Sequence, residues 1–271
     1  MHRKILYIIY KRLRPAFGLA FGFTLIYGLY INKITPPLLL AGLAFIFIET
    51  FGGLYNDYWD YEEDLRNRRK DKLTTMGILS RVQVRNLSFL FLGIGLSIVL
   101  ILNAALFVLG LYWVTIFVLY CIPQVRLKGH IRSYLLASSI FFFFPFALDV
   151  TLGVGFSFTT LIFGLLFFSQ FMYILCQKDS TDPEDEKNIF LRHGWIKPSI
   201  IMAFFASSAL FFLLMVCLIN PVLIIVWIFN LSLKMLNVKK IITRSITRRA
   251  RYRLMLLEFL TPYLYIGGFF L

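Results

Sequence analysis

The sequence predicts an all-α integral membrane protein, a polytopic bundle of nine transmembrane helices formed by residues 1–271 as a single membrane-embedded domain. Three observations lead to this fold class. Hydrophobic residues make up 59% of the chain and charged residues 15%, and the mean hydropathy is +0.77. Several apolar runs are long enough to cross a bilayer as helices. The basic residues gather in alternate segments between these runs, as they do in multi-span membrane proteins.

The apolar runs divide into nine expected spans, in the order in which the chain presents them. These are residues 16–32, 37–55, 86–103, 104–121, 134–149, 157–176, 198–219, 221–236 and 254–271. Only Asn103 separates the third span from the fourth, and Pro221, after Asn220, divides the seventh from the eighth, because proline interrupts a helix.

Charge gives an independent test of this count and also predicts the orientation. The segments on one side, residues 1–15, 56–85, 122–133, 177–197 and 237–253, hold 26 of the 28 Lys and Arg residues. The loops of the other side hold only Lys33. The positive-inside rule therefore predicts a cytoplasmic N-terminus, cytoplasmic basic loops and an outer C-terminus. A net charge of +14 spread over five segments indicates topology and membrane lipid contact, and it does not favour nucleic acid binding.

Acidic residues cluster at the end of the second span. At about 100° per residue, Asp60, Asp64 and Asp57 follow Asn56 at about 40°, 80° and 100°, so the four polar side chains share one face of one predicted helix. Glu49 lies on the same face. Clustered carboxylates are costly near a bilayer unless a cation neutralises them, and their spacing suits Mg²⁺. The simpler alternative is a solvated helix end, balanced by the arginines that follow.

A second acidic cluster, within residues 179–186, follows the sixth span on the same side of the membrane. It contains Asp179, Asp182 and Asp185. Two such clusters facing each other across a bundle could hold more than one Mg²⁺ and a diphosphate. The alternative is an ordinary turn, because Asp182 precedes Pro183 and could cap a helix.

Basic residues on the same side could neutralise a diphosphate as it leaves. The loop between spans four and five supplies Arg126 and Lys128, and Arg14 lies at the mouth of the first span. A departing diphosphate needs such charge stabilisation. Ordinary positive-inside charge is the competing explanation for each of them.

Together these motifs resemble the UbiA superfamily of intramembrane prenyltransferases, over nearly the whole chain. The resemblance is carried by Asn56 to Asp64 with Asn67 after it, the Tyr120 to Lys128 loop, Arg14-Pro15 and the acidic loop after span six. It implies Mg²⁺-dependent transfer of a prenyl group from a polyprenyl diphosphate donor to a lipophilic acceptor within the membrane. The catalytic residues implied are Asp60, Asp64 and Lys128. The metal ligands implied are Asn56, Asp57, Asp60, Asp64, Asp179, Asp182 and Asp185. The substrate-binding residues implied are Arg14, Asn56, Lys72, Arg126 and Lys128.

Two departures from the family pattern leave alternatives open. Asp179, Asp182 and Asp185 are spaced three apart, where family members often have two aspartates four apart, so any two of them could bind the metal. Many members read Arg-Pro-x-Arg-Pro after the asparagine that corresponds to Asn67, and here Lys72 would replace the second arginine. Members prenylate aromatic rings, haem precursors, glycerol phosphate lipids and carotenoids, so the acceptor stays open.

Three other functions compete with this one. A transferase of the UbiA superfamily could use a prenyl phosphate as its acceptor. A CDP-alcohol type transferase also uses aspartates and Mg²⁺, but Tyr61 stands where that motif has glycine. A cation transporter would place acidic residues near the bilayer midplane on broken helices, whereas these cluster at one membrane face.

Overall fold

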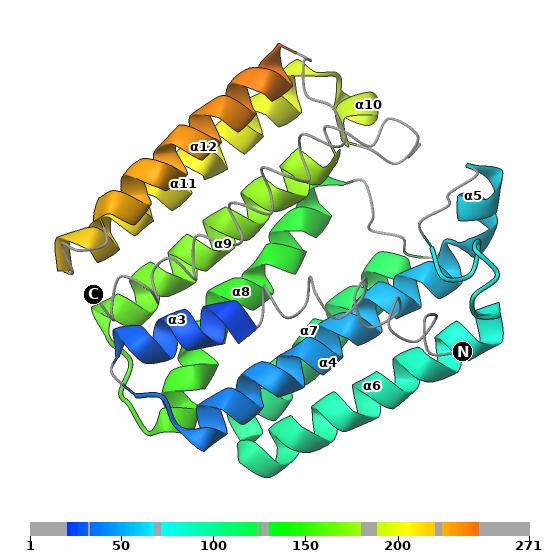
Figure 1. The fold of residues 1–271 in the computed structure, drawn as a ribbon, viewed down its shortest axis with the longest axis horizontal. Helices are drawn as coiled ribbons and strands as arrows, with labels where there is room; N and C mark the ends of the chain where they lie inside the picture. The colour runs from blue at the N-terminus through cyan, green and yellow to red at the C-terminus, as the bar shows by residue number, and fades with distance from the viewer. Residues whose placement is uncertain are drawn as a thin grey trace. The chain divides into compact units, whose positions relative to one another are not determined.

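The computed structural model describes residues 21–31, 33–67, 72–123, 125, 130–179, 189–219 and 224–243, and their regular structure is helical throughout. This confirms the all-α prediction. The chain forms two compact units, the first within residues 1–128 and 150–154, the second within residues 129–149 and 155–271 (Figure 1). The single domain expected from the sequence stays a prediction.

The first unit contains five described helices. They are α3 (Gly22–Tyr30), α4 (Pro36–Trp59), α5 (Tyr61–Arg66), α6 (Arg81–Leu102) and α7 (Ala104–Cys121). The sequence marks their starts. Thr35 caps α4 ahead of two prolines, which suit the first turn because its amides need no intrahelical partner. Ser80 and Gln83 form a reciprocal capping box at the start of α6.

Asn103 alone separates α6 from α7, as the sequence predicts. Its backbone is extended, with φ −169° and ψ 141°, and its side chain accepts a hydrogen bond from the amide of Ala105 at 2.7 Å. One residue therefore ends the first helix and caps the second, which turns the chain sharply between two apolar helices.

Helix α4 packs closely against α6 and α7, and glycines make this approach possible (Figure 1). A Cβ atom on Gly95 of α6 would lie 2.8 Å from Ile48 Cγ1 and 3.0 Å from the carbonyl oxygen of Ala44. A Cβ atom on Gly52 would lie 2.6 Å from the ring of Phe117 in α7. Small residues allow helix backbones to approach closely in membranes, so α4 is held firmly on two sides.

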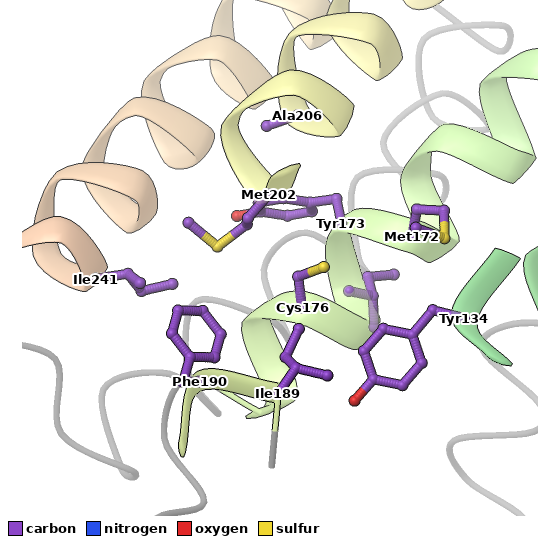
Figure 2. Packing of buried hydrophobic residues seen from close by; sticks show 10 residues of the cluster. Tyr134, Met172, Tyr173, Cys176, Ile189, Phe190, Met202, Ala206 and Ile241 are labelled. Atoms are coloured by element: carbon purple, nitrogen blue, oxygen red, sulfur yellow. The ribbon is translucent and has the colours of Figure 1, made fainter. Parts of the chain in front are cut away.

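The second unit contains α8 (Ile131–Leu152) up to Asp149, together with α9 (Phe158–Asp179), α10 (Ile189–His193), α11 (Ile196–Ile219) and α12 (Ile224–Ile242). Helix α11 lies alongside both α9 and α12 (Figure 1). Figure 2 shows the buried cluster that joins them, with Tyr173 and Cys176 of α9, Phe190 of α10, Met202 of α11 and Ile241 of α12.

Six described helices have the length and hydropathy to cross a membrane: α4, α6, α7, α8, α9 and α11. The chain is therefore an integral, multi-pass membrane protein. Helix α12 carries three lysines in its 19 residues, and α3 overlaps the first predicted span. The ninth predicted span, residues 254–271, lies outside the described residues. The count of nine spans stays a prediction, and so does the orientation of the termini.

Candidate active site

The acidic stretch at the end of α4 is a helix with a bend, which corrects the prediction of one continuous helix. Helix α4 ends at Trp59, Asp60 has φ −82° and ψ 3°, and α5 begins at Tyr61. The Asp60 amide still donates to the Asn56 carbonyl at 2.9 Å, and the Asp64 amide donates to the Asp60 carbonyl at 2.7 Å. Both bonds join residues four apart, so helical hydrogen bonding continues across the bend.

The three aspartates that the sequence places on one face are all buried. Asp57 is 0% exposed, Asp60 5% and Asp64 6%. Charged side chains are rarely buried to this extent unless they are paired or bind a cation. The first turn of α5 is also acidic, which suits the partial positive charge at a helix N-terminus.

Asn56 orients the central aspartate. Its side-chain amide donates to Oδ2 of Asp60 at 2.9 Å, and the thiol of Cys121 lies 3.8 Å from its Oδ1 as a weak donor. The contact between α7 and α4 thus reaches the acidic face. Sequence reasoning missed Cys121, because its spacing from the motif carries no local signal.

Lys72 lies over the same face. Its Nζ is 2.7 Å from Oδ1 of Asp57 and 3.8 Å from Oδ2 of Asp64, and its side chain is only 12% exposed. An ammonium between two buried carboxylates offsets part of the cost of burying them. Lys72, which the family resemblance implies as a substrate-binding residue, therefore lies directly at the acidic stretch.

Arg81, at the start of α6, holds both sides of the bend, and sequence reasoning missed it. Its Nε donates to the Tyr58 carbonyl at 3.1 Å, and its guanidinium carbon lies 4.7 Å from the centroid of the Tyr58 ring and 5.7 Å from that of Tyr61. Its Nη1 is 3.7 Å from Oε1 of Glu62. One side chain thus combines a hydrogen bond, two cation–π contacts and an ion pair across the junction of α4 and α5.

The remaining predicted residues are not placed together by the described part of the chain. Asp179 is the last residue of α9, and its backbone alone is described. The others lie outside the described residues: Arg14, Arg126, Lys128, Asp182 and Asp185. Among the residues that the structure describes, no three His, Cys, Asp or Glu side chains gather as a complete metal site.

The donors that are present fit a hard cation. Asp60 and Asp64 offer carboxylate oxygens one helical turn apart, and the side-chain amide of Asn56 orients the Asp60 carboxylate by donating to it. Mg²⁺ binds through one or two carboxylates and takes its other ligands from water and phosphate. Two buried carboxylates on adjacent turns thus match the share of the coordination that a protein supplies in a Mg²⁺–diphosphate site.

Comparison with known proteins decides the family. Residues 16–192 match the UbiA prenyltransferase family. The chain belongs to this family. The acidic motif of α4 and α5 lies inside the matched residues, as does the loop after α7. The resemblance that the motifs suggest is thus confirmed.

Individual relatives agree with this assignment. The chain is 36% identical to digeranylgeranylglyceryl phosphate synthase from Archaeoglobus fulgidus over 83 residues, which are 29% of this chain and 28% of that relative. A structure of a UbiA homologue from Archaeoglobus fulgidus bound to GPP and Mg²⁺ superposes with a TM-score of 0.69 and 17% identity, covering 97% of this chain and 98% of that chain. A structure of a digeranylgeranylglyceryl phosphate synthase gives a TM-score of 0.65 and 17% identity, covering 99% of this chain and all of that one. These likenesses establish the UbiA fold.

Proposed function

We propose that this UbiA-family prenyltransferase moves a prenyl group from a polyprenyl diphosphate to a lipophilic acceptor within the membrane, with Mg²⁺ as its cofactor. The observation that carries the proposal is the set of three buried aspartates on adjacent turns of α4 and α5, with Lys72 over them. Solved UbiA homologues bound to GPP or DMAPP together with Mg²⁺ support it.

Several described residues have separate proposed roles in binding the diphosphate donor. Asp60 and Asp64 would hold the metal, with Asn56 fixing the orientation of Asp60 through its hydrogen bond and Asp57 close by. A bound Mg²⁺ neutralises charge on the diphosphate as the carbon–oxygen bond breaks. Lys72 lies within 4 Å of two of the carboxylates, so its ammonium can also reach a diphosphate held beside them.

Residues whose side chains the structure does not describe complete the proposed site. Lys128 and Arg126 would add positive charge at the leaving diphosphate, with Arg14 as a further contact. Two of Asp179, Asp182 and Asp185 would bind a second Mg²⁺. The acceptor then attacks the allylic carbon that the diphosphate leaves.

A narrower class of acceptor is a lipid that carries a phosphate. The relative that is named for making a glyceryl phosphate lipid supports this class of acceptor. A prenyl phosphate acceptor would belong to the same class. Family membership disfavours the cation transporter. We also propose that the basic loops, and with them the active site, face the cytoplasm, because they contain nearly all of the Lys and Arg residues.

The test of this function is release of pyrophosphate from geranylgeranyl diphosphate by the purified protein in detergent with a membrane lipid extract. Release is expected to require both Mg²⁺ and the extract. Asp60→Ala is expected to reduce it by about 100-fold or more, the scale of losing one group that stabilises transition-state charge. Arg66→Gln, which removes a charge from an exposed position two residues after Asp64, should keep release within about twofold. Mg²⁺-dependent turnover that persists in Asp60→Ala would contradict the proposal.

A further inference from the structure

Helix α4 contains a carboxyl group that the proposed metal site does not use. Glu49 lies near the middle of α4, seven residues before Asn56, inside a segment long and apolar enough to cross a membrane. Its side chain is partly exposed, although Ile48 and Thr50 on either side of it are buried. Ionisable side chains are costly inside membrane helices, and they commonly mark functional positions there.

Glu49 is one of three partly exposed residues that share a face of α4. Gly53 follows it by four positions and Asn56 by seven, so at about 100° per residue the three lie within about 60° of one another. We call these three residues the accessible strip. Leu40, an exposed apolar residue, lies nine positions before Glu49 and therefore about 180° away around the helix. The accessible strip thus lies on the face of α4 opposite to that exposed apolar side chain.

The packing of α4 leaves the Glu49 side chain within reach of a ligand. Gly52 meets α7, where a Cβ atom would lie 2.6 Å from the ring of Phe117. Gly42, seven positions before Glu49, is covered by α3, where a Cβ atom would lie 3.2 Å from Cβ of Thr24. Between these contacts Glu49 keeps accessible surface, and no residue in the described part of the chain forms a hydrogen bond or ion pair with its carboxyl group.

Prenyl transfer to a hydroxyl group releases a proton that a base has to take. As the hydroxyl oxygen bonds to the allylic carbon, the bond from that carbon to the diphosphate breaks, and the diphosphate leaves with the electron pair. The attacking oxygen then carries one proton too many, and water is excluded from such a site. A carboxylate within hydrogen-bond reach can take the proton as a general base.

The spacing along α4 suits this role. Seven residues place Glu49 about 10 Å from Asn56 along the helix axis, on the membrane side of the acidic motif. The interval has to hold the allylic carbon, which follows the diphosphate by one bond, and the attacking atom, about 3 Å further on. A base at the far end of this interval meets the acceptor and not the diphosphate.

We propose that Glu49 is the general base of the reaction and takes the proton from a hydroxyl group of the lipid acceptor as that oxygen bonds to the donor. The inference rests on the proposed function, and it adds a catalytic residue and the class of the attacking group. One carbon–oxygen bond forms while another breaks, the pyrophosphate keeps the electron pair, and the proton passes to Glu49 and from there to water. An acceptor that attacks through an ionised phosphate oxygen would need no such base.

The experiment measures pyrophosphate release from geranylgeranyl diphosphate by purified Glu49→Gln, with Mg²⁺ and the membrane lipid extract. The rate at saturating donor is expected to fall about 100-fold, the lower end for loss of a general base, while the Kd for geranylgeranyl diphosphate stays unchanged. Glu49→Asp should recover part of the rate, because it keeps a carboxyl group. Thr50→Val is the matched control, since the Thr50 hydroxyl is buried one position away and donates to the Ile46 carbonyl at 2.7 Å, and its rate should stay within about twofold of wild type.

Three results would overturn the proposal. One is a wild-type rate in Glu49→Gln. Another is an equal loss of rate and of donor binding, because that pattern belongs to a residue that only supports the structure. The third is a labelled lipid product in which the prenyl group is joined to carbon or to a phosphate oxygen, whereas an ether is expected.

If Glu49→Gln does not fold, the wild-type protein itself can be tested with dicyclohexylcarbodiimide, an apolar reagent that modifies carboxyl groups. Mg²⁺ and pyrophosphate shield the aspartates during the treatment and are then removed. Peptide mapping is expected to find the reagent on Glu49, with release lost and donor binding retained. An unmodified Glu49, or full release after its modification, would overturn the proposal.

Failure of the proposed function gives a different pattern. A wild-type protein that releases no pyrophosphate would overturn prenyl transfer and the role of Glu49 together. An active wild type beside an equally active Glu49→Gln would overturn only the role of Glu49.

Discussion

At the scale of single residues, the positive charge of Lys72 offsets part of the negative charge of the buried carboxylates beside it. Asp57 is fully buried, and its carboxylate lies 2.7 Å from the Lys72 ammonium. The carboxylate of Asp64 lies 3.8 Å from the same ammonium. Removing one member of a buried ion pair costs more than the pair contributes, because the remaining charge stays buried. Lys72 therefore supplies positive charge at the place where we propose that a divalent cation binds.

Lys72→Met is expected to lower the free energy of unfolding by about 3 kcal/mol, the lower end of the range for breaking a buried pair. The variant should also gain more thermal stability from added Mg²⁺ than wild type does, because the metal would then supply the missing positive charge. Melting curves with and without Mg²⁺ measure both effects, and Lys72→Arg is the control that keeps the charge. An equal gain from Mg²⁺ in wild type and Lys72→Met would show that the metal does not bind at these carboxylates.

The residue scale also shows what local pattern can predict. The common face of Asn56, Asp57, Asp60 and Asp64 was predictable because residues four or fewer apart are placed by helix geometry alone. Cys121 and Arg81 were not, because their contacts depend on how α6 and α7 return to the end of α4. Lys72 was suggested only by the family resemblance, and its contact with Asp57 spans 15 positions of sequence.

At the scale of helices, the acidic stretch is supported by α6, which meets it at two levels. Arg81 at the start of α6 contacts Tyr58 and Glu62, which lie on either side of the bend between α4 and α5. About four turns further along, Gly95 lies directly against α4 at Ala44 and Ile48. The first contact positions the bend, and the second sets the distance between the two helices.

Arg81→Ala is expected to raise the Mg²⁺ concentration for half-maximal activity about 10-fold, because the bend that carries Asp60 and Asp64 loses its support. Its effect on thermal stability should be small, about 1 kcal/mol, since the side chain is 36% exposed and its ion pair is screened by water. Arg85→Ala, one turn further along α6, should leave both quantities unchanged. A large loss of stability without a shift in the Mg²⁺ dependence would make Arg81 a structural residue only.

Gly95→Ala is expected to destabilise the protein by about 1–3 kcal/mol, because the added methyl group would meet the backbone of α4. Gly93→Ala in the same helix should be neutral or slightly stabilising, because a Cβ atom there meets nothing within 4 Å and alanine favours the helix. Thermal unfolding in detergent compares the pair. Equal behaviour of the two variants would mean that α4 and α6 do not pack as closely as described.

At the scale of the whole molecule, the sequence predicts which segments are helical better than it predicts their ends. Helix α4 runs past residue 55 to Trp59, α6 begins at Arg81 instead of residue 86, and α12 extends past residue 236 to Ile242. The hydropathy runs stop where polar residues begin, but the backbone hydrogen bonds continue. All three extensions lie on the side predicted to be cytoplasmic, and one of them carries Asp57. The fold class was therefore predictable from apolar runs and charge, whereas the exact ends required tertiary packing.

The predicted orientation can be tested by cysteine labelling after the three buried cysteines are replaced by serine. A membrane-impermeant maleimide should label Gly155→Cys in intact cells, because that loop is predicted to face outward. Met76→Cys, in an exposed loop on the predicted cytoplasmic side, should be labelled only after the membrane is opened. Both variants should react in detergent, which controls for accessibility. The reverse pattern in intact cells would invert the topology.

The helical hydrogen bonds that continue across Asp60 also limit which insertions and deletions this part of the chain can accept. Adding or removing one residue between Asp60 and Asp64 would rotate Asp64 by about 100° away from Asp60, and it would also carry Lys72 out of register with Asp57. Loss of a residue between Asn67 and Lys72 would leave the aspartates in phase and change only the reach of the lysine. Active variants of this chain should therefore accept insertions or deletions after residue 67 more readily than between residues 56 and 64.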